Sequence, residues 1–207
     1  MATRPGERHA GRPEPTERSP VRRATTHRLL TVPATAAVLA VTAACGPADA
    51  PAPEGPVTYD VPGVPATLTA PAGWERSTQD GAFLVRSDEA GGSPAARANV
   101  VVTAETATQS LEEAGDDTVG YVEDLAGWQQ DADGQGPTTL GEAPAYRVSG
   151  TFEDEGALVA QEILLVEAPA DGATWVVQIT ASYARDDAEG AAQAREAVES
   201  VRVGPAG

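Results

Sequence analysis

Cys45 is the only cysteine of the 207-residue chain, and the residues before it show which reaction its thiol undergoes. Three small residues, Thr42-Ala43-Ala44, precede it, and an apolar stretch runs before them from Leu29 to Val41. Three arginines stand ahead of that stretch, at positions 22, 23 and 28. Basic residues, a short apolar run and small residues, in that order, are typical of an export signal that is removed after the small residues.

Thr42-Ala43-Ala44-Cys45 resembles a lipobox, the recognition sequence of lipoprotein signal peptidase, with Thr42 where leucine is usual. The resemblance implies cleavage after Ala44 and a diacylglycerol thioether on Cys45, whose two acyl chains anchor a protein stably. Ordinary secretion with cleavage after Ala44 and a free Cys45 thiol is the alternative. The apolar run is too short for a transmembrane helix, which needs about 20 residues. We expect residues 1–44 to be a lipoprotein signal peptide, with translation starting at Met1 or near Val21.

The chain after residue 44 is strongly acidic. It holds seven arginines, no lysine, no histidine and 28 Asp and Glu residues, which give a formal net charge of −21. A surface of this charge repels nucleic acid and anionic lipid headgroups, so we expect neither as a partner. The simplest role of the charge is solubility.

The side chains that most often perform catalysis are missing after residue 44. Both histidines, His9 and His27, precede it. This excludes Ser–His and Cys–His nucleophile pairs, Schiff-base lysines and ordinary zinc sites from the remainder of the chain. Paired carboxylates can cleave glycosidic bonds, but spacing singles out no pair among 28 acids. We therefore expect no catalytic residue and no cofactor, with a carboxylate-dependent envelope hydrolase as the alternative.

One acidic segment matches part of the calcium-loop template. Asp131, Asp133, Gly136 and Glu142 stand at template positions 1, 3, 6 and 12. Gln135 replaces the usual Asp or Asn, and Pro144 prevents a following helix. We expect an acidic, glycine-rich loop with no bound metal.

Two arginines and four aromatic residues raise the question of a ligand site. Arg97 and Arg147 lie in predicted strands, where either could hold an anionic ligand, and we expect them to pair with carboxylates instead. The aromatic side chains could line a cleft between sheet and helix, and we expect them in the core. They are Tyr121, Tyr146, Trp128 and Trp175.

The remaining pattern predicts a tether and one folded domain. Residues 45–65 hold the lipidated cysteine and a proline-rich, extended tether, and residues 66–204 form a single domain. Strands are predicted over 66–70, 81–87, 98–104, 136–140, 145–152, 158–167 and 174–181, and helices over 111–128 and 186–200. Asp171-Gly172 predicts a hairpin turn between the last two strands. This order indicates an α+β fold with a mostly antiparallel sheet.

Several segments together resemble the LpqN/LpqT family of actinobacterial lipoproteins. The resemblance covers about residues 64–204 and includes Pro71-Ala72-Gly73-Trp74, Gly141 to Arg147 and the two helices, in addition to the leader and tether. It implies a PsbP-like α/β/α sandwich, in which helices flank a mostly antiparallel sheet. The family has no established catalytic residues, so the resemblance implies none here.

These observations predict a membrane-anchored lipoprotein on the extracytoplasmic face of the cell membrane. We expect its domain to be a non-enzymatic binding or scaffolding module of the cell envelope. Its partner would be an envelope protein or a small apolar ligand, and its ligand-binding residues and oligomeric state stay open.

Overall fold

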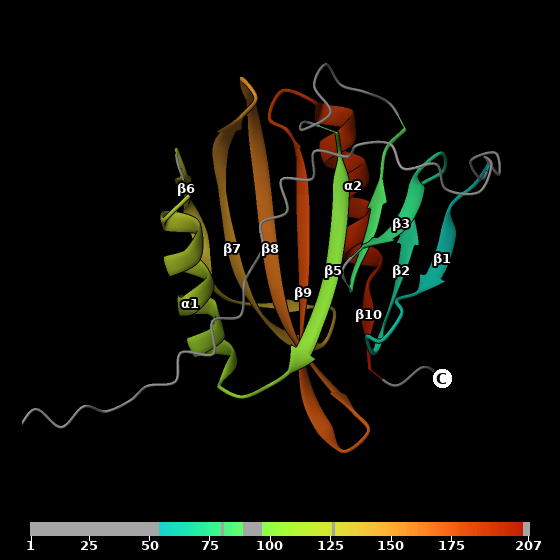
Figure 1. The fold of residues 1–207 in the computed structure, drawn as a ribbon, viewed down its shortest axis with the longest axis vertical. Helices are drawn as coiled ribbons and strands as arrows, with labels where there is room; N and C mark the ends of the chain where they lie inside the picture. Colours follow the sequence, from blue (N-terminus) through green and yellow to red (C-terminus); the bar gives the residue numbers. More distant parts are fainter. Residues whose placement is uncertain (1–53, 80, 89–96, 126, 205–207) are drawn as a thin grey trace, which may run out of the picture. The chain divides into compact units, whose positions relative to one another are not determined.

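The computed structural model describes residues 54–79, 81–88, 97–125 and 127–204 (Figure 1). All of them belong to one compact unit. The predicted cleavage and lipidation residues, Ala44 and Cys45, lie outside the described residues.

Seven strands form one antiparallel sheet, in the spatial order β3-β4-β5-β9-β8-β7-β6. Strands β6, β7, β8 and β9 follow one another through two-residue turns. At the β8–β9 turn, Asp171 and Gly172 have φ values of 53° and 77°, as a type I′ turn requires, so the predicted hairpin is confirmed. The strands are Glu75–Gln79 (β3), Ala82–Arg86 (β4), Asn99–Thr106 (β5), Gln129–Leu140 (β6), Ala143–Asp154 (β7), Ala157–Ala170 (β8) and Ala173–Ala184 (β9).

Three strands form a second antiparallel sheet, of which the sequence predicts only the strand over residues 66–70, and that strand is confirmed. They are Val57–Asp60 (β1), Ala66–Ala70 (β2) and Arg202–Val203 (β10), in the order β1-β2-β10. The predicted tether over residues 45–65 is therefore too long at its C-terminal end. Tyr59 explains why β1 folds, since its ring packs 5.8 Å from that of Phe83 and lies under the guanidinium of Arg76.

Helix α1, Leu111–Glu123, begins at a complete capping box. Ser110 accepts a hydrogen bond from the Glu113 backbone, and the Glu113 carboxylate accepts one from the Ser110 backbone. The helix ends before the predicted residue 128. Gly127 has a φ of 81°, and Trp128 leaves the helix to stack on Phe152, with ring centroids 6.4 Å apart.

Helix α2, Ala188–Ser200, lies close to the sheet because its inner face is made of alanine. Ala194 and Ala197 are completely buried. Asp187 caps its first turn by accepting a hydrogen bond from the Gly190 backbone at 2.8 Å. Trp74 packs beneath this helix and donates a hydrogen bond to the Gln193 side chain at 3.0 Å.

The seven-stranded sheet buries side chains on both faces, and each face packs against a different helix (Figure 1). Helix α1 packs on β6, β7 and β8, whereas α2 packs on the opposite face against β9 and β5, and also contacts β2. The α2 core includes Leu68, Trp74, Val100, Val166, Ile179 and Ala197, and the α1 core includes Val122, Tyr146, Val148, Ile163 and Leu165. The predicted α+β class, with helices flanking a mostly antiparallel sheet, is confirmed.

Among the described residues, neither helix combines the length and the apolar character needed to cross a membrane.

Candidate functional site

A groove of about 440 Å³ lies beside α2, on the sheet face that this helix partly covers. Strands β6 to β9 form its floor, and the C-terminal half of α2 forms one wall. The residues that line it are Asp131, Thr138, Thr139, Leu140, Arg147, Ser149, Gly150, Ala160, Gln161, Glu162, Leu164, Tyr183, Arg195, Val198 and Glu199.

Polar side chains dominate this groove. Hydroxyl groups, two guanidinium groups and three carboxylates face it, against a few aliphatic residues such as Leu140, Leu164 and Val198. The Gln161 amide points to the other sheet face, where it bonds Ser182. Such a lining offers hydrogen bonds and charges of both signs, and little apolar surface. Because an apolar ligand needs an apolar cleft, the groove suits a polar partner better than a lipid chain.

Arg147 in the groove is held by the backbone. Its Nη2 donates a hydrogen bond of 2.7 Å to the carbonyl oxygen of Asp133. Beside it, the Ser149 hydroxyl donates to the Asp131 carboxylate at 3.0 Å. These two contacts fix the irregular part of β6 against β7, and they leave Arg147 without a carboxylate partner among the described residues.

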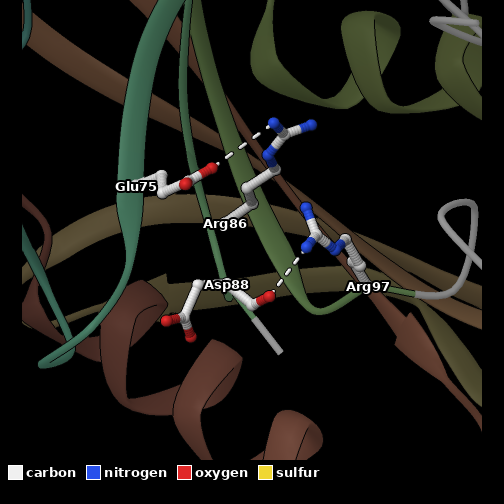
Figure 2. A network of polar contacts seen from close by, with 4 residues as sticks. All are labelled: Glu75, Arg86, Asp88 and Arg97. Atoms are coloured by element: carbon white, nitrogen blue, oxygen red, sulfur yellow. Dashed lines mark hydrogen bonds and ion pairs between the residues drawn. The ribbon is translucent and has the colours of Figure 1, made fainter. Parts of the chain in front are cut away.

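Among the described residues, neither Arg97 nor Arg147 pairs with a carboxylate, contrary to the expectation. Arg97 also donates to a backbone carbonyl, that of Asp88, at 2.7 Å (Figure 2). The single ion pair in the part of the chain that the structure describes joins Arg86 to Glu75 at 3.4 Å (Figure 2).

The segment that matches the calcium template is an edge strand. Strand β6 covers residues 129–140, and its pairing with β7 shifts register between Gln130 and Gln135. Asp131 bonds Ser149, while Asp133 offers its backbone to Arg147. No cluster of three or more metal-ligating side chains occurs within the described ranges. The single loop that would wrap a calcium ion is therefore not formed.

The groove carboxylates lie near its surface. Glu162 is half-buried, and Asp131 and Glu199 are exposed. None of the Asp and Glu side chains that the structure describes is fully buried. Glycoside hydrolysis needs one carboxyl whose pKa is raised, usually by burial, opposite a second carboxylate. The structure brings no such buried pair together among the residues it describes.

The four aromatic side chains belong to the two cores, as expected. Tyr146 is buried, while Tyr121, Trp128 and Trp175 are half-buried against the cores. The Tyr146 hydroxyl donates to Asp116 on α1 at 3.3 Å and accepts from Gln135 on β6 at 3.1 Å. Tyr146 therefore links α1 to the edge strand, and it lines no cleft.

The sequence singled out only Arg147 and Asp131 among the groove residues. Glu162 carried a signal that could have been used, because it is an acid within the apolar strand Leu158 to Glu167. Arg195 and Tyr183 carried none, because their approach to the groove depends on how α2 packs on the sheet.

Comparison with solved structures supports the fold. The structure resembles LpqN of Mycobacterium tuberculosis, a protein involved in cell envelope biogenesis, with a TM-score of 0.54 and 21% identity over 74% of this chain and 86% of that one. A protein of Bacteroides thetaiotaomicron matches with a TM-score of 0.49 and 14% identity, over 72% and 48% of the two chains. The Ran-binding protein Mog1p of Saccharomyces cerevisiae matches with a TM-score of 0.45 and 15% identity, over 72% and 96%.

Sequence comparison identifies the family. No curated protein sequence matches the chain. The family model described as "Probable lipoprotein LpqN" matches residues 54–203, which include both sheets and both helices. This match covers well over half of the sequence, and it agrees with the predicted LpqN/LpqT resemblance. The chain therefore belongs to the Lpp-LpqN family of probable lipoproteins.

Proposed function

We propose that this protein is anchored by a lipid on Cys45 to the extracytoplasmic face of the cell membrane, and that its domain binds a polar envelope partner in the groove beside α2 without catalysis. Membership in a family of probable lipoproteins and the lipobox-like Thr42-Ala43-Ala44-Cys45 support the anchor. The role of the related M. tuberculosis LpqN in cell envelope biogenesis supports the place of action.

The anchor is tested on the mature N-terminus. Mass spectrometry of the protein from membranes should show that it begins at Cys45 and carries a diacylglycerol. Replacement Cys45→Ser should remove the acyl chains and block cleavage after Ala44. An unmodified Cys45 on the mature protein, or wild-type protein found in the cytosol, would contradict the anchor whatever the domain binds.

The polar lining of the groove is the observation that carries the binding function. Its hydroxyl and charged side chains match a hydrophilic partner surface, with Tyr183 as a half-buried aromatic contact. An envelope protein fits this lining better than the small apolar ligand that was the alternative. The hydrolase alternative gains no support, because no described carboxylate is buried.

Site-specific crosslinking in intact cells tests the groove. A photoreactive amino acid at position 183 should give a discrete crosslinked product with an envelope protein. The same amino acid at Glu112, exposed on α1 on the opposite face, serves as the matched control. Equal products from both positions, or none from position 183 in correctly localised protein, would refute binding in the groove.

A further inference from the structure

Two arginines lie together on the sheet face opposite the groove. Arg86 ends β4 and is paired in register with Asn99, the first residue of β5. Arg97 precedes Asn99 by two residues, and the bond from the Ser87 N–H to the Ala98 carbonyl continues the pairing beyond the strand ends. Arg86 and Arg97 are therefore diagonal neighbours across an antiparallel pair, which long side chains span.

Within the ranges that the structure describes, neither arginine is neutralised strongly. Arg97 is fixed by its bond to the Asp88 carbonyl oxygen, and the Asp88 carboxylate points away from both guanidinium groups (Figure 2). Arg86 meets Glu75 at 3.4 Å, and the Glu75 side chain is 54% exposed. An exposed ion pair of this kind contributes little to stability, so another anion can displace Glu75 from Arg86.

Uncharged hydrogen-bonding side chains continue from this pair across the sheet. Strand register places Asn99 beside Ser182 on β9, and Ser182 beside Gln161 on β8. Gln161 donates to the Ser182 hydroxyl at 3.1 Å, and Asn99 donates to the Arg97 carbonyl at 2.8 Å. Two cations are thus followed by amide and hydroxyl groups, in a chain whose surface is otherwise rich in carboxylates.

We propose that Arg86 and Arg97 form an oxyanion site for the phosphate group of a small phosphate ester, whose uncharged, hydroxyl-bearing part lies along Asn99, Ser182 and Gln161. A guanidinium group presents paired N–H donors that match phosphate oxygens, and two of them suit a doubly charged monoester. The remaining acidic surface repels large polyanions but acts weakly on a small ion at contact distance, because salt screens charges beyond about 8 Å. This site is separate from the groove beside α2.

Titration calorimetry of the full chain in detergent, with glycerol 3-phosphate at constant ionic strength, tests the site. Saturable binding is expected, and Arg97→Gln and Arg86→Gln should each weaken it about tenfold or more, because each removes a charge-assisted pair of hydrogen bonds. Glu75→Gln should tighten it severalfold by releasing Arg86. Arg202→Gln is the matched control, because Arg202 is exposed, lies outside both sites and, like Arg97, donates to backbone carbonyl oxygens, those of Glu199 and Val201.

The source of the phosphate is distinguished by soluble short-chain lipids. Binding of dihexanoylphosphatidylglycerol in place of glycerol 3-phosphate, lost in Arg97→Gln, would assign the same site to a lipid headgroup. The proposal is refuted if neither compound binds saturably, if Arg202→Gln weakens binding as much as Arg97→Gln, or if Glu75→Gln leaves the affinity unchanged. Arg side-chain Nε–Hε resonances that shift on titration only at Arg86 and Arg97 would locate the ion directly.

Discussion

The contact between Gly115 and Tyr146 gives the sharpest test of how α1 packs. Gly115 is buried in the middle of α1, and the Tyr146 ring lies against its backbone. A Cβ atom at this position would lie under 3.0 Å from three carbons of that ring, which real Cβ atoms essentially never do. Gly115→Ala therefore forces the helix or the ring to move. The ring has little freedom, because its hydroxyl is bonded to both Asp116 and Gln135.

Two opposing effects set the magnitude. Alanine is favoured over glycine in a helix interior by about 1 kcal/mol. Overpacking a core costs about 1–3 kcal/mol, and the held ring puts Gly115 near the upper end of that range. We expect Gly115→Ala to lower the free energy of unfolding by about 2 kcal/mol, which is about 4–8 °C in Tm for a domain of this size.

Gly120 provides the control within the same helix. It is exposed, and a Cβ atom there meets no neighbour within 4 Å. Gly120→Ala should therefore stabilise the protein by about 1 kcal/mol. Urea unfolding of both variants, followed by tryptophan fluorescence, should separate them by about 3 kcal/mol. In a protein that already carries Tyr146→Ala, the further change Gly115→Ala should raise the free energy of unfolding, because the obstructing ring is absent. Equal stabilisation by both alanine substitutions would refute this packing.

Three further outcomes follow from the described contacts. Trp74→Ala should lower the free energy of unfolding by about 3–5 kcal/mol, because Trp74 is only 2% exposed beneath α2. Gln193→Met should lower it by about 1 kcal/mol, because it leaves the indole N–H without its acceptor. Urea unfolding measures both changes. Ser110→Ala should cost about 1 kcal/mol through loss of the N-cap. Hydrogen bonds from the Ser110 backbone and hydroxyl hold the Glu113 pKa below its ordinary value of 4.5. The stabilisation that comes from the ionised Glu113 carboxylate is therefore present above pH 4.5 and is lost as the pH falls through the folded pKa. Glu113→Gln should abolish that part of the acid dependence of unfolding. Calcium should give no saturable heat in calorimetry, and binding that is lost in Asp131→Ala would contradict the structure of β6.

Strands buried in the middle of the sheet were predictable, and edge strands were not. The run Leu158 to Glu167 lies within β8, and the alternation from Trp175 to Ala181 lies within β9, because burial on defined faces leaves an apolar pattern. Strand β3 and the first half of β6 are polar edge segments without that pattern. Polar residues and Pro137 suit an edge, because they discourage pairing with another chain.

The candidate site was less predictable than the fold. Its residues come from four strands and one helix, and only their packing brings Arg147, Glu162 and Arg195 to one groove. The sequence showed Arg97 and Arg147 as rare cations, but surplus acid made ion pairing the natural expectation. In the structure, Arg97 donates to a carbonyl oxygen beyond the end of β4, and Arg147 donates to one in the irregular part of β6. No local sequence pattern predicts where such carbonyl oxygens lie.

Bonding arginines to carbonyl oxygens has a consequence for recognition by this acidic protein. A carboxylate partner would cancel the charge of a guanidinium group, whereas a carbonyl oxygen fixes its position and leaves the charge in place. Helix α1 covers one sheet face at β6 to β8, and α2 covers the other face at β5 and β9. Each face therefore keeps an uncovered polar region with an arginine bonded to a backbone carbonyl oxygen, Arg97 on the α1 face and Arg147 on the α2 face. We expect long-range repulsion to disfavour nucleic acid and other polyanions, while the two arginines act only at contact distance. An anionic group can therefore bind only where its own shape brings it onto one of these fixed donors, and this selects small or locally charged partners at both sites.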